Sequence, residues 1–236
     1  MHYQPLGRSG LMVSELCLGT MIFGEDSRRS TDAATATRMI HQFLDAGGNF
    51  IDTADVYAGG RSEEITGQAL HGRRDQVVLA TKVFMPMADA PNRGGLSRKH
   101  IQQACEASLR RLNTDWIDLL LIHWPDHNTS YMDPIRALDD LKQAGKIRHY
   151  GVSNFSPAMM QAAESVLPGR AAHLTANQIG YNMFDRRCEH TVLPYCQAHG
   201  IGFMAYGTLC YGLLTGALAA TITSDPRPRP RKAGDR

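Results

Sequence analysis

The sequence contains no apolar run of about 18 residues, which is the length that a helix needs to span a membrane. Its densest apolar stretch, Ile117–Ile122, has the length of a strand. The N-terminal segment MHYQPLGRSG also lacks the apolar centre of a signal peptide. We therefore expect neither a membrane span nor a secretory leader, and we expect a cytoplasmic protein.

The cysteines form neither a disulfide pattern nor a zinc pattern. There are five, an odd number, and no two are arranged as Cys-x-x-Cys. Reduced thiols are the simpler interpretation, and they agree with a cytosolic protein. His123 and His127 are spaced like two metal ligands on one helix face, but Pro125 breaks any helix between them. We therefore expect no metal site.

The net charge is only +2, so the sequence has no basic field directed at nucleic acid. The charge is uneven, because residues 224–236 hold five basic and two acidic residues, or +3, which leaves −1 for the rest. That segment alternates proline with arginine, a composition typical of a disordered or extended chain. We expect one domain over residues 1–220 and a Pro/Arg-rich disordered tail over residues 221–236. The alternative is a tail that grips a phosphate or an anionic surface.

Short apolar runs with high strand propensity alternate with amphipathic stretches of helical period. The runs that predict strands are Leu16–Thr20, Phe50–Thr53, Val77–Lys82, Ile117–Ile122, Tyr150–Ser153, Ala176–Gly180 and Gly202–Tyr206. The stretches that predict helices are Thr31–Asp45, Glu63–Leu70, Arg98–Leu112, Pro134–Gln143, Pro157–Ser165 and Cys188–Gln197. Such alternation predicts an α/β protein with a parallel sheet covered by helices.

Polar residues recur at or near the carboxyl ends of the expected strands, namely Asp52, Lys82, His123, Ser153 and Gln178. In a (β/α)8 TIM barrel, that end of the strands forms the active-site face. A doubly wound sheet would gather polar residues mainly at one switch point. The distribution around every strand therefore favours the barrel. A small hairpin over Tyr3–Val13, turning at Gly7–Gly10, is expected to close its bottom.

The barrel is expected to be incomplete. Strands begin about every 26 to 40 residues, so an eighth strand should begin near residue 230. Pro226, Pro228 and Pro230 cannot supply the N–H groups of a central strand. We therefore expect seven strands and a missing last βα unit, as in a C-terminally truncated chain. Its first and seventh strands would have exposed edges through which copies of the chain can form an oligomer.

Four residue types in this arrangement suit carbonyl reduction. Lys82 ends an apolar strand, and burying its ammonium requires a carboxylate partner, for which Asp52 on the adjacent strand is the candidate. The ammonium is expected to lower the pKa of Tyr57, which is about 10 in a free tyrosine. Tyr57 would then act as the general acid, and His123 would orient the substrate carbonyl.

Each of these residues also has a purely structural interpretation. Asp52 and Lys82 could form a purely structural buried pair, because buried ion pairs also occur without a function. His123 alone is typical of a core histidine, and Tyr57 alone is typical of a surface aromatic. Three further apolar residues on the same face could line a substrate pocket or simply pack, namely Phe23, Met85 and Trp124. Cys210 is expected to be a bystander, because no cationic partner is evident near it.

The ordered segments NFIDTADVY (49–57), ATKV (80–83), LIHWP (121–125), GVSNF (151–155), NQIGYN (177–182) and MAYG (204–207) resemble the aldo-keto reductase superfamily. The resemblance covers roughly residues 1 to 218. It implies a (β/α)8 barrel with an Asp-Tyr-Lys-His set, here Asp52, Tyr57, Lys82 and His123. GGRSEE (59–64) resembles the segment that follows the family's catalytic tyrosine.

The resemblance also implies a bound NADP(H), with NAD(H) as the other candidate. In the family's pattern, Ser153, Asn154 and Gln178 would hydrogen-bond the nicotinamide carboxamide, and Tyr206 would stack on the ring. The family's pyrophosphate-covering loop matches Gly207–Gly216, which implies contacts from Gly207, Thr208, Leu209, Gly212 and Leu213. We do not expect the cofactor to bind through a Rossmann fold. The loose match to the Rossmann glycine fingerprint at Gly200–Ala205 opens a strand rather than a helix.

Three functions remain as hypotheses. The first is an NADP(H)-dependent oxidoreductase that reduces a small aldehyde or ketone to an alcohol. The second is a non-enzymatic regulatory subunit with the same fold, since some relatives of this family serve ion channels. The third is a catalytically impaired remnant, which is suggested by the missing eighth unit. None of them involves nucleic acid or a membrane as a partner.

Overall fold

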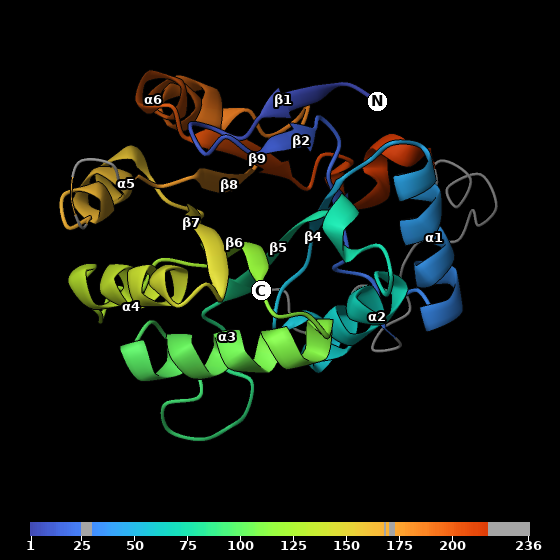
Figure 1. The fold of residues 1–236 in the computed structure, drawn as a ribbon. Coiled ribbons are helices and arrows are strands. Elements are labelled where there is room, and N and C mark those ends of the chain that lie inside the picture. Colours follow the sequence, from blue (N-terminus) through green and yellow to red (C-terminus); the bar gives the residue numbers. More distant parts are fainter. Residues whose placement is uncertain (25–29, 168, 170–172, 217–236) are drawn as a thin grey trace, which may run out of the picture.

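The computed structural model describes residues 1–24, 30–167, 169 and 173–216, and its centre is one parallel sheet. The sheet contains seven strands, in this order: β3 (Leu18–Gly19), β4 (Phe50–Asp52), β5 (Val78–Val83), β6 (Ile117–Ile122), β7 (Ile147–Ser153), β8 (Ala176–Gly180) and β9 (Gly202–Tyr206). Each strand pairs with the next one along the chain, and the sheet curls into an open half-barrel (Figure 1). The expected α/β barrel architecture with seven strands is confirmed.

In the described part of the chain, six helices surround the curled sheet on its outer side (Figure 1). They are α1 (Ala33–Asp45), α2 (Arg61–Ala69), α3 (Arg98–Leu112), α4 (Met132–Gln143), α5 (Pro157–Glu164) and α6 (Val192–His199). Four short 3-10 turns complete the described elements, namely η1 (Tyr57–Gly60), η2 (Arg74–Gln76), η3 (Arg187–His190) and η4 (Cys210–Thr215). Because strand side chains alternate in direction, Leu120 and Ile122 of β6 join the core under the helices, whereas Leu119 and Leu121 join a separate inner core.

Local chemistry sets the ends of several helices as the sequence predicts. The Ser97 hydroxyl accepts a hydrogen bond from the His100 N–H at the start of α3, and Ser156 does the same at the start of α5, where Pro157 occupies the first position. Gly200 follows α6 with a φ of 65°. This left-handed conformation ends the helix without the strain that a Cβ would add.

The helix expected over Cys188–Gln197 forms differently. An unbroken helix would place Pro194 in its interior, where the ring clashes with a carbonyl of the preceding turn and removes a hydrogen bond. The chain instead forms η3, leaves helical geometry at Thr191 with a φ of −139°, and begins α6 at Val192. Pro194 therefore falls in the first turn of α6, where a proline is tolerated.

The N-terminal hairpin forms as expected from β1 (Tyr3–Pro5) and β2 (Met12–Ser14), which pair antiparallel. Gly7 and Gly10 both have positive φ, at 57° and 80°, as the turn requires. Leu6 and Val13 are buried in the inner core together with Phe50, Ala80, Leu119, Leu121, Ala176 and Met204. The hairpin thus closes one end of the half-barrel.

The two ends of the described sheet are β3 and β9. Within the described residues, neither strand pairs with another strand on its outer side. The expected tail over residues 221–236, and the position where an eighth strand was expected, lie outside the described residues. Among the described residues, no helix is both long and apolar enough to cross a membrane.

Candidate active site

The carboxyl ends of β4 and β5 carry a buried ion pair. Lys82 Nζ lies 2.7 Å from Asp52 Oδ2, and the Lys82 side chain is fully buried, with 0% exposed. Asp52 pairs in register with Ala80, so Lys82, two residues later, points to the same side of the sheet. The predicted partnership of Asp52 with Lys82 is therefore confirmed, and its cause is the parallel register.

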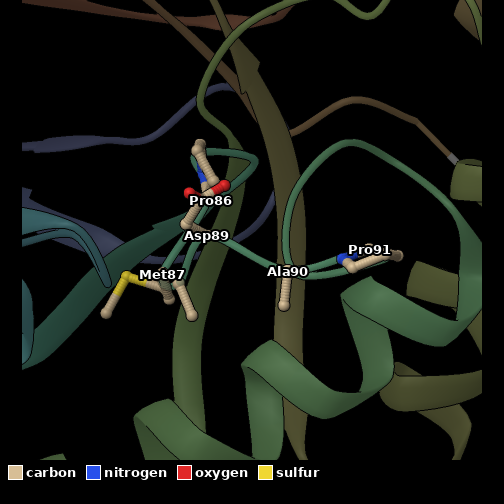
Figure 2. A pocket seen from close by; sticks show the side chains of 6 residues that line it. Pro86, Met87, Asp89, Ala90 and Pro91 are labelled. Carbon is tan, nitrogen blue, oxygen red and sulfur yellow. The ribbon is translucent and has the colours of Figure 1, made fainter.

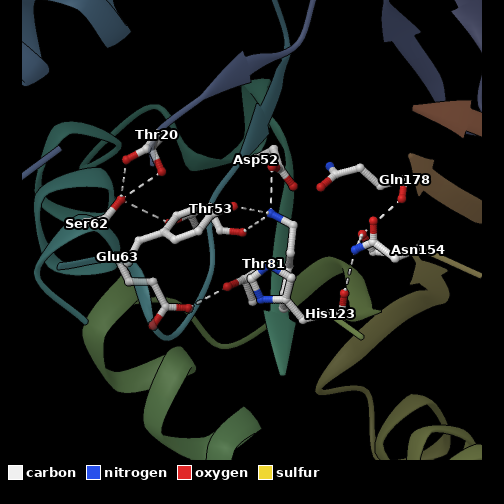
Figure 3. Close-up of polar contacts among 12 residues, drawn as sticks. Thr20, Asp52, Thr53, Ser62, Glu63, Thr81, His123, Asn154 and Gln178 are labelled. Atoms are coloured by element: carbon white, nitrogen blue, oxygen red, sulfur yellow. Dashed lines mark hydrogen bonds and ion pairs between the residues drawn. The ribbon is translucent and has the colours of Figure 1, made fainter. Parts of the chain in front are cut away.

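Two further groups surround the same ammonium. Lys82 Nζ donates hydrogen bonds to the Thr53 carbonyl oxygen at 2.8 Å and to the Tyr57 hydroxyl at 3.2 Å (Figure 3). The Tyr57 and His123 rings meet edge to face, with centroids 6.0 Å apart. The structure therefore brings Asp52, Tyr57, Lys82 and His123 together, although they come from two strands, one 3-10 turn and the residue that follows β6.

The pKa of Tyr57 differs from the sequence-based expectation. Burial raises this pKa above its ordinary value, and the nearby Lys82 ammonium offsets only part of the rise, so the expected lowering is wrong. For Lys82, burial lowers the pKa, but Asp52 and Tyr57 more than reverse that effect and the pKa ends above its ordinary value. At neutral pH the pair is therefore an ammonium beside a protonated phenol.

His123 follows β6 and is held in its neutral form. Burial, together with the charge of Lys82, lowers the pKa of His123 to about 4. Its Nδ1 atom is buried and has no hydrogen-bond partner in the described part of the chain. A neutral imidazole can donate one hydrogen bond, so His123 can interact with a carbonyl oxygen placed near Tyr57.

A second polar group follows the carboxyl ends of β7, β8 and β9. The Asn154 side-chain amide donates to the His123 carbonyl oxygen at 3.1 Å and to the Ser153 hydroxyl at 3.0 Å, and the Tyr206 hydroxyl donates to Asn154 Oδ1 at 2.9 Å. The Ser153 hydroxyl donates to the Gln178 carbonyl oxygen at 2.9 Å. These contacts join all four residues for which nicotinamide contacts are expected.

The Gln178 side chain differs from the others in this group. It is only 5% exposed, yet its amide makes no hydrogen bond within the described residues. Figure 3 shows Gln178 next to Asn154. An amide that is nearly buried and unpaired is suited to bind a polar ligand group, because such a group would satisfy it.

The loop after β9 is held at its first residue by Asn182. The Gly207 carbonyl oxygen accepts a hydrogen bond from the Asn182 side-chain amide at 3.3 Å. Leu209 and Leu213 are 58% and 48% exposed, and Thr208 is also exposed. Gly212 lies within η4 with a φ of 99°. Within the described residues, Thr208, Leu209 and Leu213 are therefore exposed, whereas Gly207 and Gly212 are partly buried.

Behind the four-residue set lies a buried network that the sequence reasoning did not identify. Glu63 is fully buried, its Oε1 accepts a hydrogen bond from the Thr81 hydroxyl at 2.6 Å, and its Oε2 accepts one from Arg111 Nε at 2.7 Å. Thr81 precedes Lys82 in β5, so the two side chains point to opposite faces of the sheet. Figure 3 shows Glu63 joined to Thr81. The match of GGRSEE to the segment after the family's tyrosine was the signal that could have identified Glu63.

A neighbouring cluster of hydroxyl groups holds the first turn of α2 against the sheet. The Ser62 hydroxyl donates to the Thr20 carbonyl oxygen at 2.8 Å and lies 3.2 Å from the Thr53 hydroxyl. Ser62 and Thr53 are both fully buried. Thr53 also supplies a carbonyl oxygen to Lys82, so this cluster fixes one of the acceptors around the ammonium.

The residues considered for an apolar pocket lie in different environments. Phe23 is fully buried in the main core, which supports ordinary packing, whereas Trp124 is 45% exposed beside His123. Met85 is half-buried at the end of β5. An open hollow also lies nearby, but one loop, Pro86–Pro91, provides all of its lining (Figure 2). A hollow made by a single loop gives no converging polar groups of the kind that define a ligand site.

The chain matches a known protein family over most of its length. The sequence profile of the Aldo/keto reductase family matches residues 15–233. The aldo-keto reductase YhdN of Bacillus subtilis is 40% identical over 225 residues, which cover 94% of this chain and 66% of YhdN. A probable voltage-gated potassium channel subunit beta of Oryza sativa subsp. japonica is 38% identical over 238 residues, which cover 96% of this chain and 70% of that protein.

The fold matches solved structures as well. The holo form of the aldo-keto reductase AKR11C1 from Bacillus halodurans superposes with a TM-score of 0.80 at 34% identity. The match covers 100% of this chain and 72% of that chain. The chain thus spans about two thirds of YhdN and somewhat more of the other two proteins.

Proposed function

Since the chain belongs to the aldo/keto reductase family, we propose that it is an oxidoreductase that reduces a small aldehyde or ketone to an alcohol with NADP(H), or with NAD(H). The observation that carries the proposal is the Lys82 ammonium, hydrogen-bonded to both Asp52 and Tyr57. This arrangement provides a phenol that is protonated at neutral pH and a fixed cation beside it. Proton donation to a carbonyl oxygen requires both the protonated phenol and the fixed cation.

Tyr57 is the proposed proton donor. Because burial raises its pKa, the hydroxyl keeps its proton until a stronger acceptor forms next to it. As the O–H bond breaks, the proton moves to the substrate oxygen and the phenolate that remains is stabilised by Lys82 at 3.2 Å. His123, which is neutral, donates a hydrogen bond that orients the carbonyl, and Asp52 keeps Lys82 in place.

The polar group at the ends of β7, β8 and β9 is suited to a nicotinamide. The unpaired Gln178 amide, with Ser153 and Asn154 next to it, complements a carboxamide, and the half-buried Tyr206 ring offers a flat face. A nicotinamide cofactor supplies the hydride in this chemistry. We propose that Gly207 and the loop containing Thr208, Leu209, Gly212 and Leu213 lie along the remainder of the cofactor. The exposed side chains of Thr208, Leu209 and Leu213 leave room for it.

Replacing Tyr57 with phenylalanine tests the proposal directly. Purified protein should oxidise NADPH in the presence of a small aliphatic aldehyde, and Tyr57→Phe should lower kcat by at least about 100-fold, because general acid catalysis contributes factors of this order. Tyr195→Phe is the matched control, since the Tyr195 hydroxyl bonds to Glu164 outside the site. Equal turnover by Tyr57→Phe and the parent would remove Tyr57 from the mechanism.

The similarity to a potassium channel subunit beta favours a second candidate, a cofactor-binding regulatory subunit. In that case the chain would bind NADPH, which quenching of protein fluorescence measures, but would not turn over aldehydes. The chain would also form a stable complex with a partner protein, which a pull-down would detect. Turnover that depends on Tyr57 would exclude a purely regulatory role.

A further inference from the structure

Asp55 is a buried acidic residue with no part in the chemistry described above. It lies two residues before Tyr57, in the loop that joins β4 to η1, and its relative exposure is 0%. Its backbone N–H donates a hydrogen bond to the Lys82 carbonyl oxygen at 3.3 Å. The same loop therefore carries Tyr57 and touches β5 at Lys82.

The Asp55 carboxyl group is unpaired. Both of its oxygens are buried, and neither has a hydrogen-bond partner within the described residues. A carboxylate in such surroundings is disfavoured, so the neutral acid persists to a higher pH than in a free aspartate. Burial raises the pKa of Asp55 to about 7 and the carboxylate of Glu63 adds to the rise, whereas Arg111, the Val56 backbone N–H and Lys82 oppose it.

The charged groups around Asp55 are already matched with each other. The charges of Glu63 on α2 and Arg111 on α3 act on Asp55, and these two residues form an ion pair of 2.7 Å. The charge of Lys82 on β5 acts on Asp55 more weakly, and Lys82 is paired with Asp52 at 2.7 Å. The two cations thus balance two other carboxylates. Ionisation of Asp55 would add a third negative charge with no cation of its own.

We propose that Asp55 is a positioning residue of the reductase site, one that works as the neutral acid and weakens the Lys82–Tyr57 pair when it ionises. The inference rests on the proposed function. While Asp55 is protonated, the charge of Lys82 is shared between Asp52 and Tyr57 alone. When Asp55 loses its proton, the new carboxylate attracts the same ammonium and repels a developing phenolate, which makes Tyr57 a weaker acid.

The pH dependence of the reductase reaction tests this role. In the parent protein, kcat with NADPH and a small aliphatic aldehyde should fall about three- to tenfold between pH 6 and pH 8, which corresponds to a change of up to about one unit in the Tyr57 pKa. Asp55→Asn and Asp55→Ala carry no charge at any pH. Both should keep a flat profile over this range.

Glu64→Gln is the matched control, because Glu64 follows Glu63 on α2 but is exposed and pairs with Arg61 at 2.8 Å. This variant should keep the alkaline fall of the parent. A profile of Asp55→Asn that falls as the parent does would overturn the role of Asp55 alone. Absence of turnover in the parent would overturn the proposed function and the role of Asp55 within it.

Thermal unfolding gives a second readout that does not depend on turnover. Because the pKa of Asp55 is raised from 3.8 to about 7 on folding, the folded chain keeps a proton that the unfolded chain has lost between these values. Stability therefore falls as the pH rises through this window. The Tm of Asp55→Asn, relative to that of the parent, should rise from pH 5 to pH 8. A constant difference would show that Asp55 is not held as a neutral acid.

Discussion

Among single residues, Lys82 links the other polar side chains of the site. Its ammonium has three protons, and the three acceptors around it are Asp52 Oδ2, the Thr53 carbonyl oxygen and the Tyr57 hydroxyl. Because the side chain is fully buried, any proton without an acceptor would be costly. The position of the Tyr57 hydroxyl thus follows from the need to satisfy a buried cation.

Replacing Lys82 with methionine should therefore destabilise the fold as well as the site. The change leaves the Asp52 carboxylate buried without a counter-charge, and we expect a loss of about 3–5 kcal/mol in the free energy of unfolding at pH 7. Urea unfolding measures the loss. Lys99→Met, at an exposed position of α3, should change stability by no more than about 0.5 kcal/mol.

The double variant Asp52→Asn/Lys82→Met separates charge from packing. It removes both charges, so it should recover most of the stability lost in Lys82→Met. If Lys82→Met alone lay within about 1 kcal/mol of the parent, Asp52 would have to be neutral or solvated in the native protein, in conflict with the described contact.

Among the secondary-structure elements, the contact between α2 and α3 sets the position of the segment behind the site. Gly67 of α2 lies against the end of α3, where a Cβ would come within 2.4 Å of the Leu112 carbonyl oxygen. The close approach lets Arg111 of α3 reach Glu63 of α2, which in turn holds Thr81 of β5. A glycine inside a helix thus keeps the network behind Lys82 assembled.

Gly67→Ala should destabilise the protein, although alanine is the better helix former by about 1 kcal/mol. The new methyl group must push α2 away from α3, and we expect a net loss of about 1–3 kcal/mol. Thermal unfolding compares this variant with Gly19→Ala, where the added Cβ meets open space. A more stable Gly67→Ala variant would mean that the two helices separate at little cost.

Across the whole molecule, the N-terminal hairpin connects the two sides of the open sheet. On one side, the Asn49 side chain before β4 binds the Ser14 N–H at 2.7 Å and the Met12 carbonyl oxygen at 2.9 Å. On the other side, Leu6 packs so closely against Gly202 of β9 that a Cβ there would lie 2.7 Å from its Cδ1 atom. The hairpin therefore holds β9, and with it Tyr206, to the rest of the sheet.

Leu6→Ala should loosen β9 more than the centre of the sheet. A buried leucine replaced by alanine costs about 2–5 kcal/mol in general. Hydrogen exchange followed by mass spectrometry should show a larger loss of protection in β9 than in β6. The control is Leu141→Ala, which removes a buried leucine side chain of α4 from the main core. This variant should not reduce protection in β9 more than in β6. Equal losses in β9 and β6 would show that the hairpin does not hold β9.

Features that depend on a few neighbouring residues follow from the sequence alone. The alternation of strands and helices, the serine caps at Ser97 and Ser156, and the polar residues that end the strands are all local patterns. The parallel register of β4 and β5 then brings Asp52 to Lys82, as the sequence predicts. The family resemblance likewise rests on short ordered motifs and is confirmed over residues 15–233.

Only the tertiary structure decides the environment of those residues. The ion pair between Glu63 and Arg111 joins positions 48 residues apart, and no local pattern specifies it. The pKa of Tyr57 rises because the packed chain excludes water from it, an effect that outweighs the neighbouring charge on which the sequence-based expectation relied. Asp55, an ordinary acidic residue in the sequence, is likewise buried, with neither carboxyl oxygen hydrogen-bonded in the described part of the chain. Local spacing brings Asp52 to Lys82, whereas the loss of water on folding and the charges that meet in the packed chain together set the protonation of the site.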